Sequence, residues 1–281
     1  MADFGVTSMV ADLQSVAVRA PSRRGDYVAA HWQQPLDLDL LAAQHREFVE
    51  RLENLGCAVV ELAPVDDMPD AVFTYDPCFV IGDGFIELRG AKAARAGEPP
   101  LLSAELQQLG VPKKGALTGE ATADGGDMFW LDDETLAIGR SYRTNDAAID
   151  QLRTMLDGSG QIEAFDLPHD QGPEYCLHLM SVVSPIRKDL ALVYERLAPI
   201  RLLQALRFRG VELLPLPEED YLSLGCNVLT VRPGVVVIAS GNDATVSLLR
   251  EHGVEVHVYA ASEITKGEGG PTCLTRPLLR G

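Results

Sequence analysis

Positive charge is scarce in this sequence. Its 281 residues include 24 Lys and Arg against 41 Asp and Glu, which gives a formal net charge of −17. A surface this acidic repels nucleic acids and anionic membranes, and it favours a cationic ligand entering a cleft. We therefore expect no nucleic-acid partner and no membrane partner, although acidity can also serve solubility alone.

Targeting and redox patterns are also absent. The N-terminus carries no basic segment followed by an apolar one, and no apolar run is long enough to span a bilayer. No two cysteines form a CxxC pair, which argues against a metal or redox motif. These absences predict a cytoplasmic protein with reduced thiols. The five cysteines are Cys57, Cys78, Cys176, Cys226 and Cys273.

A helix-to-strand pattern is present and repeated. Between residues 38 and 55, mostly apolar side chains recur at alternating spacings of three and four, which predicts an amphipathic helix. Gly56 suits the left-handed position just past a helix, and residues 57–62 then predict a strand. The pattern returns at a period of roughly 50 residues, which is typical of a repeat architecture. The glycines that end the five predicted helices are Gly56, Gly110, Gly160, Gly210 and Gly253.

Predicted hairpins lie between these units, where apolar runs flank turn residues. A fifth hairpin exists only if residues 273–275 pair with residues 15–19. Each repeat then reads strand, strand, helix, strand, and the terminal strands close a ring, which also removes edge strands. We therefore expect one domain over residues 1–281. The other four hairpins are predicted at residues 78–88, 128–139, 179–194 and 228–239.

The residue just before the first strand of each hairpin should occupy an equivalent place in every repeat. Polar residues hold all of these places, where a random assortment would more often be apolar. In a closed ring they would converge on one axis, so the sequence predicts a functional site there. They are Asp76, Asp127, His178, Asn227 and Cys273.

These residue types permit nucleophilic chemistry on a cationic substrate. A cysteine thiolate is a strong nucleophile, and His178 can pass a proton to a leaving amine and take one from water. Converging carboxylates would raise the pKa of the Cys273 thiol until a cation binds. A guanidinium fits best, because it is planar and pairs with a carboxylate through two parallel hydrogen bonds. Taken singly, each residue also has an ordinary structural interpretation.

Several motifs share their order and spacing with one group of enzymes. Residues 68–76 are similar to LPDxVFxxD, and residues 124–127 match an acidic-Gly-Gly-Asp motif. Residues 141–145 match S-x-R-T-N, residues 177–181 match L-H-L-x-S, and Cys273 sits where the nucleophile sits. Over nearly its whole length the chain resembles the guanidino-group-modifying superfamily, and most of all its dimethylarginine dimethylaminohydrolases. The resemblance implies an α/β fold, a five-bladed α/β propeller of the pentein type.

The same resemblance implies hydrolysis of an arginine-like guanidino substrate, N-methylated arginine or arginine, to citrulline and an amine. Cys273 would attack the guanidinium carbon and form a thiouronium intermediate, with His178 as general acid and base. Asp124 would orient His178 or the guanidinium, and Asp76 would grip the guanidinium. No metal or organic cofactor enters, and the partner is a small cationic guanidino amino acid. A homodimer is compatible with the sequence, which does not indicate an oligomeric state.

The resemblance also assigns residues to the ends of the substrate. Asp70 would bind the α-amino group, while Arg143 and Arg95 would bind the α-carboxylate. Asp127 and Tyr75 would complete the substrate site. Tyr75 departs from the resembled enzymes, which carry a glutamate there, so the side of the pocket that meets N-methyl groups would differ.

Four alternatives are weighed against this interpretation. Amidinotransferases share the cysteine and the histidine but transfer the amidine to an amine. A non-enzymatic propeller would lack the Cys-His-carboxylate set, which is present here. A cysteine peptidase is opposed by Asp70 and Arg143, which suit a small zwitterionic amino acid. An arginine deiminase proper is opposed by the short chain and by Met180, where those enzymes carry an aspartate two residues after the histidine.

Overall fold

The computed structural model describes residues 4–156, 160–173, 175 and 177–281. Cys176, one of the thiols predicted to be reduced, lies outside these residues. Within the described part the chain forms five α helices and five three-stranded sheets. The helices are α1 (Leu38–Asn54), α2 (Glu98–Gln108), α3 (Asp146–Met155), α4 (Ile200–Phe208) and α5 (Asp243–Glu251).

Every sheet has the same internal plan. Its middle strand pairs antiparallel with one neighbour and parallel with the other, and the parallel pair is connected through one α helix. The predicted α/β class and the strand-strand-helix-strand repeats are therefore confirmed. The sheets are β15 (Arg276–Arg280), β1 (Leu13–Arg19) and β2 (Ala58–Leu62); β3 (Cys78–Ile81), β4 (Gly84–Glu87) and β5 (Lys113–Ala116); β6 (Met128–Trp130), β7 (Thr135–Arg140) and β8 (Gln161–Asp166); β9 (Val183–Arg187), β10 (Leu190–Val193) and β11 (Glu212–Pro215); β12 (Leu229–Arg232), β13 (Val235–Ala239) and β14 (Glu255–Tyr259).

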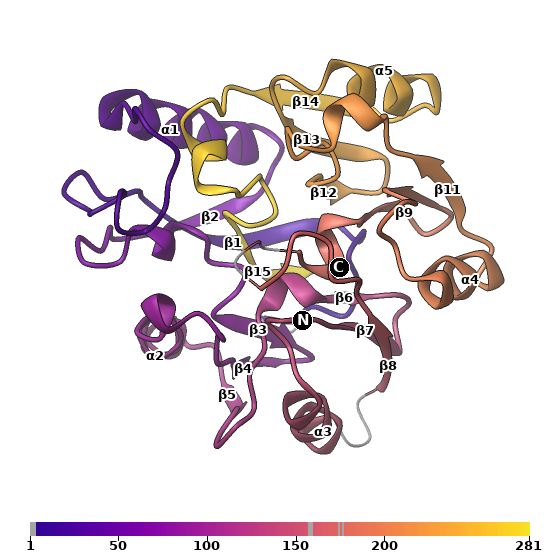
Figure 1. The fold of residues 1–281 in the computed structure, drawn as a ribbon, viewed down its shortest axis with the longest axis horizontal. Coiled ribbons are helices and arrows are strands. Elements are labelled where there is room, and N and C mark those ends of the chain that lie inside the picture. The colour runs from indigo at the N-terminus through magenta and orange to yellow at the C-terminus, as the bar shows by residue number, and fades with distance from the viewer. Residues whose placement is uncertain (1–3, 157–159, 174, 176) are drawn as a thin grey trace.

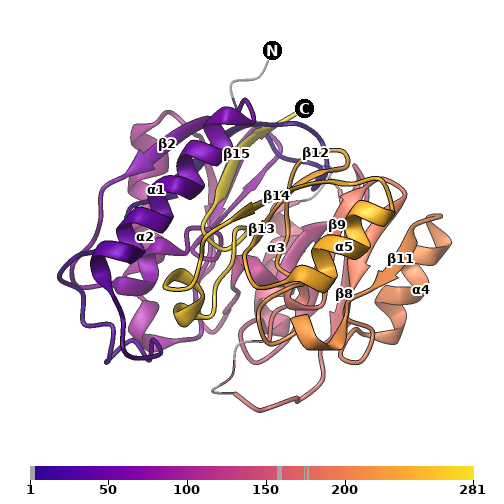
Figure 2. The same ribbon diagram turned by 90° about the horizontal axis from the view of Figure 1, so that it is seen from above.

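The helices lie at the outside and the sheets around the middle of the molecule (Figure 1). The turned view places α1 and α2 on one flank and α4 and α5 on the opposite flank (Figure 2). Strands β3, β10 and β13 are buried along their whole length, as continuous apolar runs predict. Among the described residues, no helix combines the length and hydrophobicity needed to cross a bilayer.

Local sequence explains where the helices begin and end. The side chain of Asp37 accepts hydrogen bonds from the backbone N–H groups of Asp39 and Leu40, both at 3.0 Å, and so caps the first turn of α1. Helices α1, α2, α4 and α5 are each followed by a glycine whose φ lies between +73° and +92°. Only glycine adopts this left-handed conformation freely, which is why the glycine spacing predicted the repeats. These glycines are Gly56, Gly110, Gly210 and Gly253.

Strand β15 pairs antiparallel with β1, with Leu13 opposite Arg280 and Ala17 opposite Arg276. The prediction that residues 273–275 form this strand is wrong. They belong to a turn in which the N–H of Leu274 donates to the carbonyl of Gly270 at 3.2 Å. Cys273 is therefore not committed to a β-ladder.

A second predicted strand also begins later than expected. Leu179–Ser181 is a 3-10 helix, and β9 starts only at Val183. The side-chain hydroxyl of Ser181 accepts a hydrogen bond from the N–H of His178 at 3.1 Å, which stabilises this turn. His178 thus precedes a helical turn, and its place before the strand matches the other repeats only approximately.

Candidate active site

A cavity of about 660 Å³ collects most of the predicted site residues. Its wall comes from segments that are far apart in the sequence, because loops of several repeats meet there. The sequence-predicted residues that line it are Asp70, Asp76, Arg95, Arg143, His178 and Cys273, and further lining residues include Trp32, Lys92 and Glu268. The thiol and the imidazole therefore share one cavity.

The Cys273 side chain is half-buried and is held by an amide. Asn227 Nδ2 donates to Cys273 Sγ at 3.0 Å, so this residue, which sequence placed near the axis without a role, contacts the thiol. Burial first, and then the negative charge of Asp76, raise the pKa of Cys273, while the hydrogen bond from Asn227 opposes the rise. The structure alone therefore disfavours the thiolate of Cys273 relative to an exposed cysteine.

The glycine run before Cys273 is required by close packing. A Cβ atom on Gly269 would lie 2.2 Å from Phe73 Cε1, and one on Gly270 would lie 2.6 Å from Asn227 Cγ. A side chain at Gly269 would collide with Phe73, and one at Gly270 would collide with Asn227, which contacts the thiol. These glycines therefore allow the turn to hold Cys273 against Asn227.

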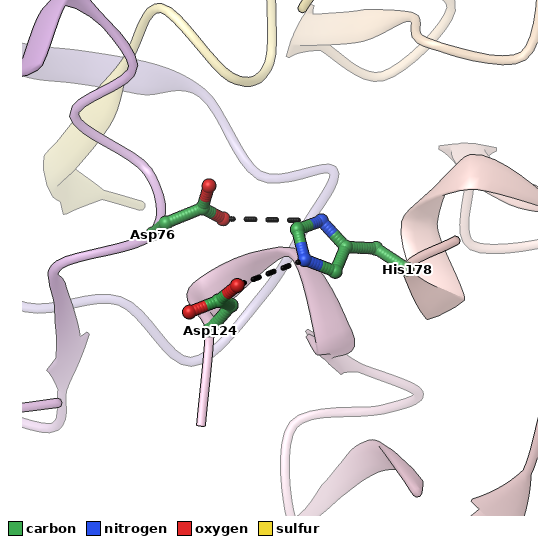
Figure 3. A group of neighbouring side chains, drawn as sticks. All are labelled: Asp76, Asp124 and His178. Atoms are coloured by element: carbon green, nitrogen blue, oxygen red, sulfur yellow. Dashed lines mark hydrogen bonds and ion pairs between the residues drawn. The ribbon is translucent and has the colours of Figure 1, made fainter. Parts of the chain in front are cut away.

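His178 lies between two carboxylates (Figure 3). Its Nε2 is 3.3 Å from Asp124 Oδ2, and its Nδ1 is 4.0 Å from Asp76 Oδ1. All three side chains are buried. Burial would raise the pKa of Asp76, but the charges of His178 and Arg95 hold it below its ordinary value. The two carboxylates can orient the imidazole for proton transfer.

The two glycines of residues 124–127 make this approach possible. A Cβ atom on Gly126 would lie 2.2 Å from His178 Nδ1, and one on Gly125 would lie 2.1 Å from the carbonyl oxygen of Tyr75. The N–H of Gly126 also donates to Asp76 Oδ1 at 3.0 Å. The motif therefore brings backbone against both the imidazole and the carboxylate.

Arg95 does not have the surroundings predicted for it. Its Nη1 donates to Asp76 Oδ2 at 2.7 Å, and its Nε and Nη2 donate to Glu98. Sequence reasoning assigned Arg95 to a substrate carboxylate and missed Glu98, although a carboxylate three residues after an arginine is a recognisable signal. Arg95 instead compensates the charges of two buried carboxylates of the protein.

Arg143 is less fully paired. It is buried, and its Nη1 lies 3.9 Å from Asp124 Oδ2. Its Nε is buried without a hydrogen-bond partner among the described residues. A buried donor left unpaired is costly, so this guanidinium is suited to receive an anionic group in the cavity.

Asp70 is held by two residues that sequence reasoning missed. The indole Nε1 of Trp32 donates to Asp70 Oδ1 at 2.8 Å, and Lys92 Nζ donates to Asp70 Oδ2 at 3.1 Å. Neither partner carries a motif that would have identified it. The predicted site for an α-amino group is thus already in contact with an ammonium.

Tyr75 and Asp127, which were predicted to bind substrate, are not among the residues that line the cavity. The ring of Tyr75 is buried and packs against the guanidinium of Arg276, whose Cζ is 4.2 Å from the ring centroid. Asp127 is fully buried, and its carboxylate accepts from Ser141 Oγ at 2.6 Å and from the N–H of Leu179 at 2.9 Å. Both residues support the loops behind the site.

Removal of the buried Asp127 carboxylate is expected to destabilise the protein. Replacing Asp127 with alanine should lower the free energy of unfolding by about 2–4 kcal/mol, because the donors of Ser141 and Leu179 would lose their acceptor. KM should stay unchanged, since Asp127 is not in the cavity. Denaturant titration and steady-state kinetics check both results, and a raised KM at normal stability would return Asp127 to the substrate site.

The same residue predicts a pH dependence. Burial raises the pKa of Asp127 from 3.8 to about 6. Between these values the folded protein binds more protons than the unfolded chain, so the contribution of Asp127 to stability is present at low pH and is lost as pH rises through 6. The Asp127→Asn variant should therefore gain stability relative to wild type over this window. Denaturant titrations across the window measure the difference, and a constant difference would contradict the raised pKa.

Among the residues that the structure describes, one group in the site could hold a metal. Asp76, Asp124 and His178 offer ligand atoms within 4.8 Å of one another. Arg95 and Arg143 already lie against the two carboxylates. Their positive charges already compensate these carboxylates and oppose a divalent metal cation at this position.

The sequence is similar to a known protein family and to several of its members. Residues 62–212 and 201–280 match the family model of arginine deiminase. Protein YkgA of Bacillus subtilis, described as uncharacterised, is 30% identical over 238 residues, which are 85% of this chain and 80% of that protein. The arginine deiminase of Pediococcus pentosaceus is 30% identical over 260 residues, covering 77% of this chain and 63% of that enzyme. This chain therefore spans slightly less than two thirds of the arginine deiminase that it matches.

A solved structure shows the same fold. The dimethylarginine dimethylaminohydrolase of Pseudomonas aeruginosa, a serine-for-cysteine mutant in complex with citrulline, matches with a TM-score of 0.80. The match covers 95% of this chain and 100% of that chain, at 20% sequence identity. At this identity the likeness establishes the fold.

Proposed function

The chain belongs to the arginine deiminase family, and we propose that it hydrolyses a C–N bond of an arginine-like guanidino substrate. The observation that carries this proposal is one cavity lined by Cys273, His178, Asp76 and Arg143. These side chains supply a nucleophile, a proton carrier, a carboxylate for a guanidinium and a guanidinium for a carboxylate. Hydrolysis of guanidino compounds is also what the names of the relatives describe.

The first half of the reaction forms a covalent intermediate. The substrate guanidinium brings positive charge beside Cys273, which lowers the pKa that burial and Asp76 had raised. The Cys273 thiol passes its proton to His178, and the thiolate attacks the guanidinium carbon so that a new C–S bond forms. His178, oriented by Asp124, donates a proton to the departing nitrogen. The C–N bond breaks, an amine leaves, and a thiouronium remains on the sulfur.

The second half of the reaction regenerates the free enzyme. His178, now neutral, takes a proton from water as the oxygen attacks the same carbon. The C–S bond breaks, His178 returns a proton to the sulfur so that the thiol of Cys273 is regenerated, and a ureido product such as citrulline leaves. Asp76 would hold the guanidino nitrogens in both steps, but first it must exchange its contact with Arg95 for one with the substrate. Every step uses groups of the chain, the substrate and water.

The proposal also covers the propeller architecture, the domain organisation and the cellular location. We place the site at the centre of a five-bladed α/β propeller of the pentein type that forms one domain over residues 1–281. The antiparallel pairing of β15 with β1 supports closure of its ring. Free thiols at Cys57, Cys78, Cys226 and Cys273 fit a reducing cytoplasm.

The direct test is a screen for ureido product. Arginine, monomethyl- and dimethylarginine, agmatine and shorter guanidino acids would each be incubated with the protein, with and without an added amine acceptor. We expect ureido product from at least one compound, independent of the acceptor. Amidine transfer to the acceptor in place of ureido product would identify a transferase, and no conversion of any compound would contradict the proposal.

Arg143 gives a prediction about the substrate carboxylate. The Arg143→Ala variant should raise KM by about 10- to 100-fold with a smaller change in kcat, because the lost contact is made equally in the ground state and the transition state. The comparison needs a carboxylate-bearing substrate and agmatine, which has no carboxylate. If KM stays unchanged for the carboxylate-bearing substrate, no carboxylate binds at Arg143.

A further inference from the structure

The carboxylate of Asp70 is held in place by hydrogen bonds from neighbouring side chains. Its two oxygens accept from Trp32 Nε1 at 2.8 Å and from Lys92 Nζ at 3.1 Å. The Trp32 indole stacks on Phe73 with ring centroids 5.6 Å apart. A Cβ atom on Gly267 would lie 2.4 Å from Trp32 Cζ2, so a glycine is needed there to leave room for the indole.

The charge of this carboxylate is already balanced. Asp70 carries one negative charge, Lys92 supplies one positive charge, and their side chains are 12% and 31% exposed. A substrate ammonium that approached Asp70 would meet the ammonium of Lys92 and would have to displace it. Like charges this close in a partly buried site oppose each other strongly.

The other carboxylates of the cavity do not replace Asp70. Asp76 is paired with Arg95, but Arg95 also pairs with Glu98 and so keeps a carboxylate partner when Asp76 receives the guanidinium in the proposed reaction. Glu268 also lines the cavity but is exposed, so water screens its charge. Arg143, in contrast, keeps a donor free for a carboxylate. Within the described cavity wall, the balance favours a substrate with a guanidinium and a carboxylate but no ammonium.

We infer that Lys92 determines specificity by occupying Asp70 and selecting against an α-amino group, so that the preferred substrate is a guanidino acid without one. This inference rests on the proposed function and names the substrate class within it. Lys92 does not take part in bond making or breaking. Its role is to compete with one end of an arginine-like ligand.

The test compares two ligands that differ only at the α-carbon. L-Arginine and deamino-arginine, in which hydrogen replaces the α-amino group, are titrated calorimetrically into the Cys273→Ser protein, which should not consume them. We expect deamino-arginine to bind more tightly. Adding Lys92→Met should shift the ratio of the two Kd values toward arginine by about five-fold, the size expected for a partly exposed ion pair.

Two matched variants separate this effect from a structural one. Lys92→Arg keeps the positive charge and should keep the preference. Lys113→Met removes a lysine that is also 31% exposed and also paired with a carboxylate, that of Glu87, but lies outside the cavity. It should leave the ratio unchanged.

The outcomes are distinct. If both ligands bind but Lys92→Met does not change the ratio of their Kd values, the role of Lys92 is overturned. The same holds if Lys113→Met changes that ratio equally. Neither outcome affects the proposed substrate class. Tighter binding of arginine than of deamino-arginine by the protein that retains Lys92 would overturn the substrate class. Binding of neither ligand would overturn both this inference and the proposed arginine-like substrate.

Discussion

Replacing Cys273 with serine is expected to lower kcat by about 10⁴-fold or more while the protein keeps its fold. A serine hydroxyl ionises far less readily than a thiol, so the nucleophile would be lost although the side chain keeps nearly the same size. Asn227 Nδ2, which donates to the sulfur at 3.0 Å, can donate to the serine oxygen as well. The measurements are the rate of ureido release and the thermal unfolding curve.

A buried cysteine outside the cavity provides the control for this variant. Cys57 is buried and does not line the cavity, so Cys57→Ser should retain activity even if it costs some stability. If the Cys273→Ser variant instead turned over at a near-normal rate, a covalent intermediate on Cys273 would be excluded.

The second large effect is expected at His178. The His178→Gln variant should lower kcat by about 10²- to 10⁴-fold, the usual contribution of a general acid and base. A glutamine amide can still form a hydrogen bond with Asp124, but it cannot carry a proton to the leaving nitrogen or take one from water. Steady-state kinetics over a pH range would show both the loss in rate and the disappearance of the ionisation that belongs to His178.

His257 offers a matched histidine outside the site. It lies on β14 and pairs with Glu255, and neither residue lines the cavity. His257→Gln should therefore keep both rate and pH profile. A His178→Gln variant with an unchanged pH profile and rate would remove the histidine from the mechanism.

Sequence reasoning was most successful where the backbone itself sets the rule. Glycines such as Gly56 and Gly253 adopt left-handed conformations after helices, and few other residues can replace them there. Their spacing therefore exposed the repeats. The same logic explains Gly125 and Gly126, where an added Cβ would collide with Tyr75 and with His178.

Strand boundaries were less predictable, because short apolar segments suit both strands and turns. Leu274 and Thr275 are buried, and their sequence is typical of a strand. Their backbone N–H groups instead form turn hydrogen bonds with the carbonyls of Gly270 and Thr272. Leu179 is likewise buried but lies in a 3-10 helix. Tertiary contacts decide such cases: the N–H of Leu179 donates to Asp127 and not to a neighbouring strand.

Contacts between ionised side chains were the least predictable part of the site. The family resemblance assigned Arg95 and Asp70 to the substrate site, but nothing in it shows that Arg95 contacts Asp76 and Glu98 or that Asp70 contacts Lys92. These pairings depend on side-chain reach in three dimensions. Likewise, Asp127 and Tyr75 stand in motifs beside site residues, and only their buried contacts reveal a supporting role.

Met180 shows how one departure can be understood from its surroundings. At this position, two residues after the histidine, an arginine deiminase proper is expected to carry an aspartate. Here Met180 is 6% exposed and belongs to the hydrophobic core. The carboxylates near His178 come instead from Asp76 and Asp124.

The central claim is that the sulfur of Cys273 becomes covalently attached to the guanidino carbon of the substrate. The most direct measurement is mass spectrometry of protein quenched in acid during turnover, followed by peptide mapping. The account predicts an added mass equal to the substrate minus the leaving amine, located on the peptide that contains Cys273. Product formation without any such adduct, or an adduct on another cysteine such as Cys226, would contradict it.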